Sequence, residues 1–261
     1  MQRVEVDGTA IGWQALGEEG APPIMLLHSL GSDQSMWVPQ TGALSADFRV
    51  VLADMRGHGA SDAPPGPYSM EGLVGDVLAV ADAAGIDRFH LCGISIGGQI
   101  ALSTAISKPE RLISVLVCNT APKFGTKEYW SERIEAIRSG GMESIREAVI
   151  DGWFSAGFPE TRPDWFAEAN DVFASTSVEG YTGCCGVLAV SDLRGTVASI
   201  ATPTLVVGGE LDISAPPAES EWLHNQIPGS SVEIIEGAAH LSNMDRPEHF
   251  NQLVADWLAD F

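Results

Sequence analysis

The fold of the chain is decided by residues 89–107, which read FHLCGISIGGQIALSTAIS. The apolar run Phe89–Gly93 is typical of a buried strand, and Gly97–Ser107 is typical of a helix that ends before Pro109. Between them, Ser95 stands in a Gly-x-Ser-x-Gly sequence, which in a strand–turn–helix context indicates a nucleophile elbow. Glycine is needed two residues to either side because so sharp a turn leaves no room for side chains there. The alternative is a glycine-rich turn with an incidental serine, and the context favours the nucleophile.

Short β-branched runs bounded by turn residues recur along the chain and indicate further strands. Besides Phe89–Gly93, these runs are Arg3–Val6, Ala10–Leu16, Ile24–Leu27, Val50–Ala53, Ser114–Cys118, Thr204–Val207 and Val232–Ile235. The first two would pair across the turn at Asp7-Gly8, and helical stretches such as Glu71–Ala84 and Pro247–Phe261 accompany the later ones. Strands that alternate with helices predict an α/β fold, with a mostly parallel eight-stranded sheet flanked by helices.

The alternation breaks between Pro122 and Arg194, where the sequence is helical in character and contains no convincing strand. The stretch holds a cluster of large aromatic residues, namely Trp130, Trp153, Phe154, Phe158, Trp165, Phe166 and Phe173. We therefore predict a helical cap at residues 122–194, inserted between a first part of the core at 1–121 and a second part at 195–261.

The chain is strongly acidic, with 35 Asp and Glu against 14 Lys and Arg and a formal net charge of -21. Such a field repels phosphate backbones and anionic lipid headgroups, so we expect no nucleic-acid partner and no membrane association. No apolar run approaches the roughly 18 residues of a membrane span, and the first residues do not resemble a signal peptide. These features predict a soluble, cytoplasmic protein that acts on a small molecule, and they leave its oligomeric state open.

The four cysteines fit neither a disulfide framework nor the spacing of a zinc site. Cys92 and Cys118 lie in predicted strands. The adjacent Cys184 and Cys185 favour a reduced, packed pair over a vicinal disulfide, because thiols stay reduced in the cytoplasm. No other His, Cys and Asp side chains show ligand spacing, so we expect no metal and no cofactor.

A nucleophilic serine needs a base and an orienting acid, which in this kind of fold follow it in the order acid, then histidine. His240 lies in the loop after the last predicted strand, and Asp212 lies in the loop after the preceding strand. Both loops leave the same sheet edge as Ser95, where sites of open α/β sheets form. The loop after Ser114–Cys118, an alternative location for the acid, offers Asn119 and no carboxylate. Glu210 stands nearer the strand and is the poorer candidate.

Two backbone N–H groups are candidates for an oxyanion hole. The Ile96 N–H opens the predicted helix after Ser95, where the helix dipole favours negative charge. The turn His28–Gly31 can supply a second donor from Leu30, and the side chain of His28 is expected to brace that turn. The glycine-rich loop Asp54–Ser61 is expected to be architectural as well.

Taken together, these segments identify the chain as a member of the α/β-hydrolase superfamily. Within it, the chain is most similar to 3-oxoadipate enol-lactonases. That similarity is carried by His28–Gly31 followed by Ser35-Met36-Trp37, by Gly180-Tyr181 leading into Cys184-Cys185, and by Ser191–Arg194. Ile96 departs from the Met of many relatives, which should matter little where a backbone N–H is used.

The resemblance implies hydrolysis of 3-oxoadipate enol-lactone in aromatic-compound catabolism by a triad of Ser95, Asp212 and His240. Its substrate would be an anionic lactone, and half of the 14 basic residues lie in the predicted cap. Arg133 follows Trp130 by three positions and so shares its helix face, which makes these two the candidate substrate-binding residues. A general carboxylesterase, a perhydrolase and a C–C bond hydrolase remain alternatives on the same fold. A ligand-binding protein without turnover is a further one.

Overall fold

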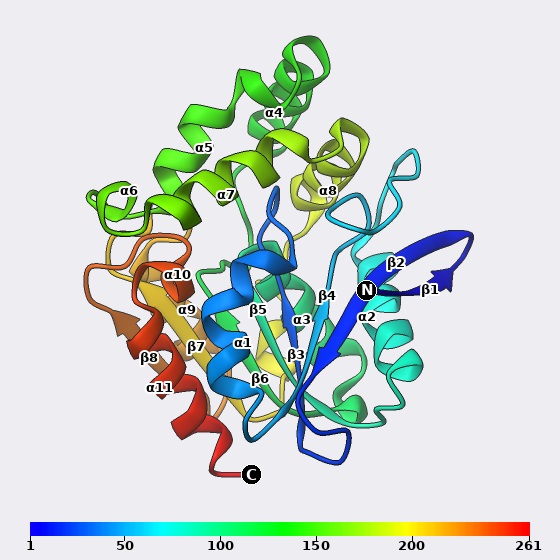
Figure 1. Ribbon diagram of the computed structural model, residues 1–261, viewed down its shortest axis with the longest axis vertical. Helices are drawn as coiled ribbons and strands as arrows, with labels where there is room; N and C mark the ends of the chain where they lie inside the picture. The colour runs from blue at the N-terminus through cyan, green and yellow to red at the C-terminus, as the bar shows by residue number, and fades with distance from the viewer.

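The computed structural model describes all 261 residues and contains one eight-stranded sheet, in the order β1-β2-β4-β3-β5-β6-β7-β8 (Figure 1). The strands are β1 Gln2–Val6, β2 Thr9–Leu16, β3 Pro23–Leu27, β4 Arg49–Ala53, β5 Phe89–Ile94, β6 Leu112–Cys118, β7 Thr204–Gly209 and β8 Ser231–Ile235. The β1–β2 and β2–β4 pairs are antiparallel, and every other neighbouring pair is parallel. The predicted α/β class and its mostly parallel sheet are confirmed.

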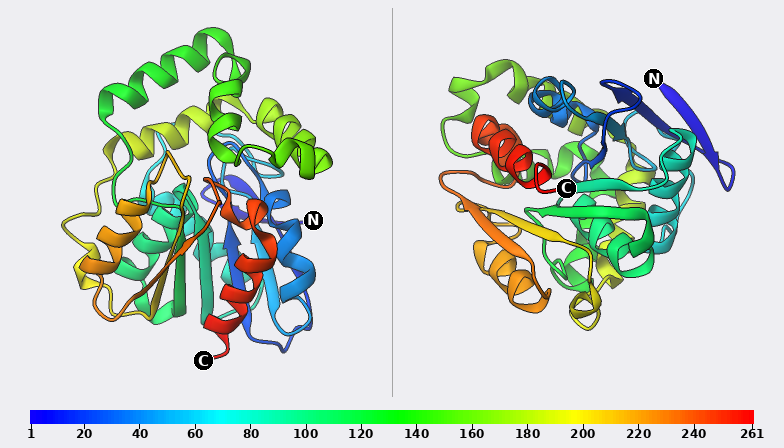
Figure 2. Two further views of the ribbon diagram at one scale, coloured as in Figure 1. Left: turned by 90° about the vertical axis from the view of Figure 1, so that its left-hand side faces the viewer. Right: turned by 90° about the horizontal axis from the view of Figure 1, so that it is seen from below.

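Helices cover both faces of the sheet (Figure 2). The helices α1 Val38–Leu44 and α11 Pro247–Leu258 pack together on one face, while α2 Met70–Ala83, α3 Ile96–Ser107 and α9 Pro217–Gln226 cover the other. The remaining core helices are short: η1 Gln34–Trp37, η2 Pro109–Arg111, η4 Val197–Ser199 and α10 Ser242–Asp245. The last helix was predicted to reach Phe261 but ends at Leu258, since the final residues form only a turn. Burial on both faces explains why β5 is buried at every position instead of alternating.

The segment between β6 and η4 contains helices and no strand, and it lies over the carboxyl ends of the parallel strands (Figure 1, Figure 2). Its helices are α4 Lys127–Gly140, η3 Met142–Ser144, α5 Arg146–Trp153, α6 Phe158–Thr161, α7 Pro163–Ser175 and α8 Val178–Val190. Aromatic rings pack against one another within it, including the stacked pair Phe154 and Phe158 at 4.1 Å. The predicted helical cap insertion is therefore present. None of the helices is long and apolar enough to cross a bilayer.

The turn from β5 into α3 is the most constrained part of the backbone. Ser95 has φ +61° and ψ −119°, a conformation that non-glycine residues rarely adopt. A Cβ added to Gly93 would lie 2.2 Å from the carbonyl oxygen of Gly97, and one added to Gly97 would lie 2.6 Å from that of Leu27. The chain thus needs glycine on both sides of Ser95 because backbone passes too close for a side chain.

We predict that Gly93→Ala lowers the free energy of unfolding by about 1–3 kcal/mol, since the added methyl group meets backbone that cannot move aside cheaply. Gly75→Ala is the matched control, because Gly75 lies inside helix α2 with no atom within 4 Å of the added Cβ. That change should stabilise the protein by about 0.5–1 kcal/mol. Urea denaturation of both variants measures the difference, and equal stabilities would contradict the steric argument.

Candidate active site

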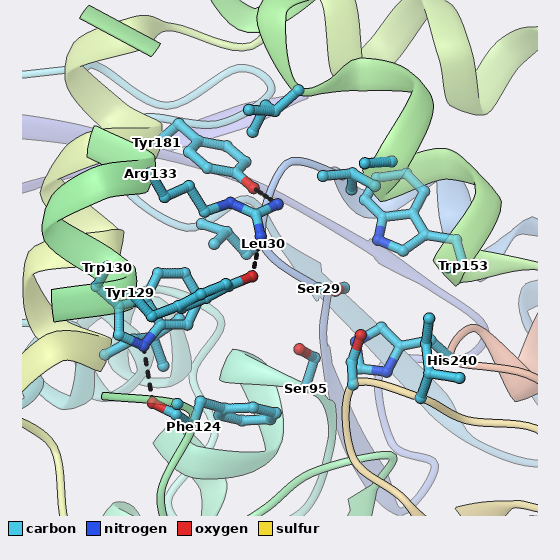
Figure 3. Close-up of a pocket in the computed structure, with 18 of the residues that line it drawn as sticks. Ser29, Leu30, Ser95, Phe124, Tyr129, Trp130, Arg133, Trp153, Tyr181 and His240 are labelled. Carbon is cyan, nitrogen blue, oxygen red and sulfur yellow. Dashed lines mark hydrogen bonds between the residues drawn. The ribbon is translucent and has the colours of Figure 1, made fainter. Parts of the chain in front are cut away.

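A cavity of about 650 Å³ lies between the cap and the carboxyl ends of the strands (Figure 3). The core lines it with Ser29, Leu30, Ser95, Ile213, Ser214 and His240, and the cap supplies the other lining residues. Five of the residues singled out from the sequence therefore meet in one cavity, namely Leu30, Ser95, Trp130, Arg133 and His240. In Figure 3, Ser95 and His240 occupy one end, with Arg133 on one side and Trp153 on the other.

Ser95 is held by its backbone, while its hydroxyl makes no hydrogen bond within the protein. Its N–H donates to the carbonyl of Cys118 at 3.0 Å, and its own carbonyl accepts from the hydroxyl of Thr120 at 2.7 Å. These bonds secure the strained turn from the neighbouring strand β6. The side chain is left free to face the cavity beside His240, and catalytic hydrogen bonds often tighten only when substrate is bound.

His240 and Asp212 form a buried pair. Nδ1 of His240 lies 3.0 Å from Oδ1 and 2.9 Å from Oδ2 of Asp212. Burial alone would raise the pKa of Asp212, but the facing His240 and the hydrogen bonds that the carboxylate accepts hold it below its ordinary value. Because an ionised carboxylate only accepts hydrogen bonds, Nδ1 must carry the proton. Nε2 is then free to accept a proton from a nucleophile.

Asn119 is a positioning residue. From the sequence it was noted only because its loop contains no carboxylate that could serve as the acid. Its amide donates to Oδ2 of Asp212 at 3.0 Å and to the carbonyl of Ala239 at 3.1 Å, and its own oxygen accepts from Ser242. One side chain thus fixes the acid and both flanks of His240. The sequence signal that could have indicated this role is its position directly after β6, because β6 lies between the strands that lead to Ser95 and to Asp212.

Asp245 joins the His240 loop to the cap, and sequence reasoning missed it. Its carboxylate accepts from the Ala239 N–H at 2.7 Å, and from the N–H and hydroxyl of the cap residue Ser155 at 3.0 and 2.9 Å. Beside it, the Leu241 N–H donates to the carbonyl of Trp153 at 2.9 Å. Burial raises the pKa of Asp245 despite these donors. The partner in the cap is too far along the chain for a local pattern to indicate it.

The two candidate oxyanion donors are free. The Leu30 N–H has no hydrogen-bond partner, and Ile96 is the first residue of α3, so that its N–H has none within the helix. The loop around Leu30 is held by two histidines. His28 donates from Nδ1 to the carbonyl of Ser29 at 2.8 Å, and Nε2 of His58 accepts from the Gly31 N–H at 3.1 Å. These contacts agree with the expectations that His28 braces the turn and that the loop 54–61 has an architectural role.

His58 must stay neutral to accept this hydrogen bond, and burial lowers its pKa from 6.5 to about 3. Between these values the unfolded chain binds a proton that the folded protein does not, so stability falls as the pH decreases. We predict that His58 contributes about 2 kcal/mol to the stability lost between pH 7 and pH 5. His58→Gln, which keeps an acceptor, should lose correspondingly less over this interval in urea titrations. An unchanged pH dependence would contradict a neutral His58.

Arg133 is the only Arg or Lys that lines the cavity; the cavity also contains one acidic residue, Glu132, which forms no salt bridge with it. Its guanidinium donates to the hydroxyls of Tyr129 at 2.6 Å and Tyr181 at 2.9 Å, and it lies 5.7 Å from the ring centre of Trp130 (Figure 3). Its Nε is buried and has no hydrogen-bond partner. Elsewhere in the cap, Lys123, Arg146, Arg162 and Arg194 all pair with carboxylates.

The side chains that could serve other chemistry are dispersed or buried. No group of three or more His, Cys, Asp or Glu is arranged to hold a metal ion. All four cysteines are free and buried, and burial raises the pKa of Cys185 to about 12. Thiols in that state are poor nucleophiles, which leaves Ser95 and His240 as the candidate reactive groups of the cavity.

A serine on a strand-to-helix turn, with a histidine and its acid in loops after later strands of the same sheet, is the arrangement of α/β hydrolases. The chain belongs to the alpha/beta hydrolase family, whose sequence model matches residues 24–253.

Several individual proteins are similar to the chain over nearly its whole length. The chain is 36% identical over 245 residues to 3-oxoadipate enol-lactonase 2 of Acinetobacter baylyi. The aligned residues make up 94% of this chain and 91% of that protein. The crystal structure of the enol-lactonase from Burkholderia xenovorans LB400 superposes with a TM-score of 0.96 at 40% identity, over 99% of this chain and all of that one. A thermophilic esterase from Thermogutta terrifontis gives a TM-score of 0.93 at 28% identity, over 100% of this chain and 99% of the esterase.

Proposed function

We propose that the protein is a serine hydrolase that opens 3-oxoadipate enol-lactone to 3-oxoadipate in the breakdown of aromatic compounds. The observation that carries this proposal is the unpaired guanidinium of Arg133 in the same cavity as Ser95 and His240. Such a cavity suits an ester that bears a carboxylate, as this enol-lactone does. The similarity to two enol-lactonases supports the same choice.

In the proposed mechanism, Ser95 attacks the lactone carbonyl while Nε2 of His240 takes the hydroxyl proton. Asp212 holds the imidazole in the tautomer that allows this and stabilises the imidazolium that results. The N–H groups of Leu30 and Ile96 hold the oxyanion of the tetrahedral intermediate. Loss of one such donor typically costs about 3 kcal/mol of transition-state stabilisation.

Collapse of the intermediate breaks the ring C–O bond and leaves an ester between Ser95 and the opened chain. The departing oxygen is an enolate, which takes a proton and ketonises, so the leaving group depends less on His240 as an acid than an alkoxide would. Water then attacks the Ser95 ester with His240 again as the base, releasing the keto diacid and the free hydroxyl.

Arg133 would bind the carboxylate of the substrate. Each terminal nitrogen carries a second N–H besides the one that a tyrosine accepts, and these N–H groups would donate to the carboxylate oxygens while the tyrosine hydroxyls hold the guanidinium in place. The ring of Trp130 lies against the guanidinium of Arg133. The Nε1 of this tryptophan is fixed by donation to the carbonyl of Phe124 at 2.7 Å. The helical cap, residues 122–194, would thus set specificity and close over Ser95 as a lid.

A general carboxylesterase is the second candidate. It is favoured by the apolar side chains that make up 12 of the 20 lining residues of the cavity and by the similarity to a thermophilic esterase. The two functions share the triad and differ in whether the substrate must be an anion, which makes Arg133 the residue that distinguishes them.

We predict that Ser95→Ala lowers kcat on the enol-lactone by about 10⁶-fold while the protein keeps its melting temperature, because a small side chain facing the cavity contributes little to the core. Ser131→Ala, on the exposed face of α4, is the control and should be fully active. A fluorophosphonate probe should label the native protein and the control but not Ser95→Ala. Normal turnover by Ser95→Ala would rule out the serine mechanism.

We predict that Arg133→Met lowers kcat/KM on the enol-lactone by about 30- to 4,000-fold, the equivalent of leaving a carboxylate without its partner in a desolvated site. A neutral aryl ester should be hydrolysed within about threefold of the native rate, since it has no group for Arg133 to bind. Arg138→Met, on an exposed position of the same helix, is the control. A parallel loss on both substrates would argue against carboxylate recognition and for a general carboxylesterase.

A further inference from the structure

The cavity is larger than a small lactone needs. Its volume of about 650 Å³ lies in the range of pockets that enclose drug-sized ligands. The basic group and its two tyrosines occupy one side of it, on helices α4 and α8. The other side has a different chemistry, and the hydrolysis of the lactone leaves it without a role.

That other side is an apolar wall. It consists of Ile145, Ala148, Val149 and Gly152 on and beside helix α5, together with Ile213 from the loop after β7. Ala148 and Gly152 are four residues apart and so share a helix face. None of these side chains offers a hydrogen-bond donor or acceptor. The indole N–H of Trp153 is the only side-chain donor on α5 that lines the cavity, so a polar occupant would replace few of its contacts with water there.

The wall is closed at Gly152 by the side chain of Ile213. A Cβ added to Gly152 would meet only the side chain of Ile213, at 3.6 and 3.9 Å, and no backbone. Ile213 itself is 76% exposed, although it is a large apolar residue next to Asp212. An apolar group bound in the cavity against Ile213 would cover this side chain and remove its exposed surface from water.

We propose that this wall binds an alkyl chain, so that the enzyme also hydrolyses alkyl esters of short dicarboxylic acids. The free carboxylate of the acyl part lies on Arg133 and the alkyl group of the alcohol lies along α5. Ser95 forms an ester with the acyl part as the C–O bond to the alcohol breaks, and the alcohol leaves with the proton from His240. Water then releases the diacid. The inference rests on the proposed function, because it uses the same serine and the same guanidinium.

The test compares kcat/KM for monomethyl, monobutyl and monohexyl glutarate, with the enol-lactone as reference. Burial of each methylene should raise kcat/KM by about fourfold, so the monobutyl ester should exceed the monomethyl ester by at least tenfold. Gly152→Leu and Ala148→Phe place larger side chains in the part of the cavity where the alkyl chain would bind, so they should bring this ratio to about one. Gly186→Leu is the control, because Gly186 lies in cap helix α8 with open space around it and does not line the cavity. It should keep the native ratio.

The ratio is taken within each variant, so that a general loss of activity cancels. A native ratio near one, with the enol-lactone turned over, would overturn the alkyl site and leave the proposed function intact. A ratio that persists in both Gly152→Leu and Ala148→Phe would also overturn it, since the chain would then bind elsewhere. Rising ester activity without turnover of the enol-lactone would support the alkyl site and refute the lactone function.

Discussion

The buried carboxylate of Asp212 is the group on which the arrangement of the site depends. It accepts hydrogen bonds from His240, from the amide of Asn119, and from the N–H groups of Ser214 and Ala215 at 2.8 and 2.9 Å. A buried charge is tolerated only when it is satisfied in this way. The requirement forces the loops after β6, β7 and β8 into contact and so fixes His240 beside Ser95. Removing any one donor would leave the charge less well solvated.

A second buried titratable group near this edge of the sheet, His58, is kept neutral. Burial lowers the pKa of His58 to about 3, where the imidazole can accept from Gly31, while Asp212 stays ionised close by in the fold. Burial disfavours the charged form of both groups, but only Asp212 has a facing histidine and several hydrogen-bond donors that offset this cost. A neutral brace for the oxyanion loop adds no positive charge that would compete with Arg133 for an anionic substrate.

Much of the fold and of the candidate site could be predicted from the sequence, because both rest on local patterns. All eight strands, the elbow at Ser95 and the loops that carry Asp212 and His240 follow from short apolar runs and the turns between them. Asn119 and Asp245 could not be predicted. Their roles depend on contacts with Ala239 and Ser155 that only the packed fold creates. The apolar wall depends likewise on which face of α5 turns inward.

The net charge of -21 is compatible with the proposed anionic substrate, because charges on the surface and a charge inside the cavity act over different distances. Surface carboxylates are screened beyond about 8 Å at physiological ionic strength, whereas a group inside a cavity is screened much less. Most cap cations are neutralised by neighbouring acids, but Arg133 is fixed by tyrosine hydroxyls that carry no charge of their own. The positive charge of the cavity therefore comes from one side chain in a partly desolvated place, with Glu132 as the one acidic residue of the lining. Its strength near Ser95 is set locally, which lets the surface remain acidic without excluding the substrate.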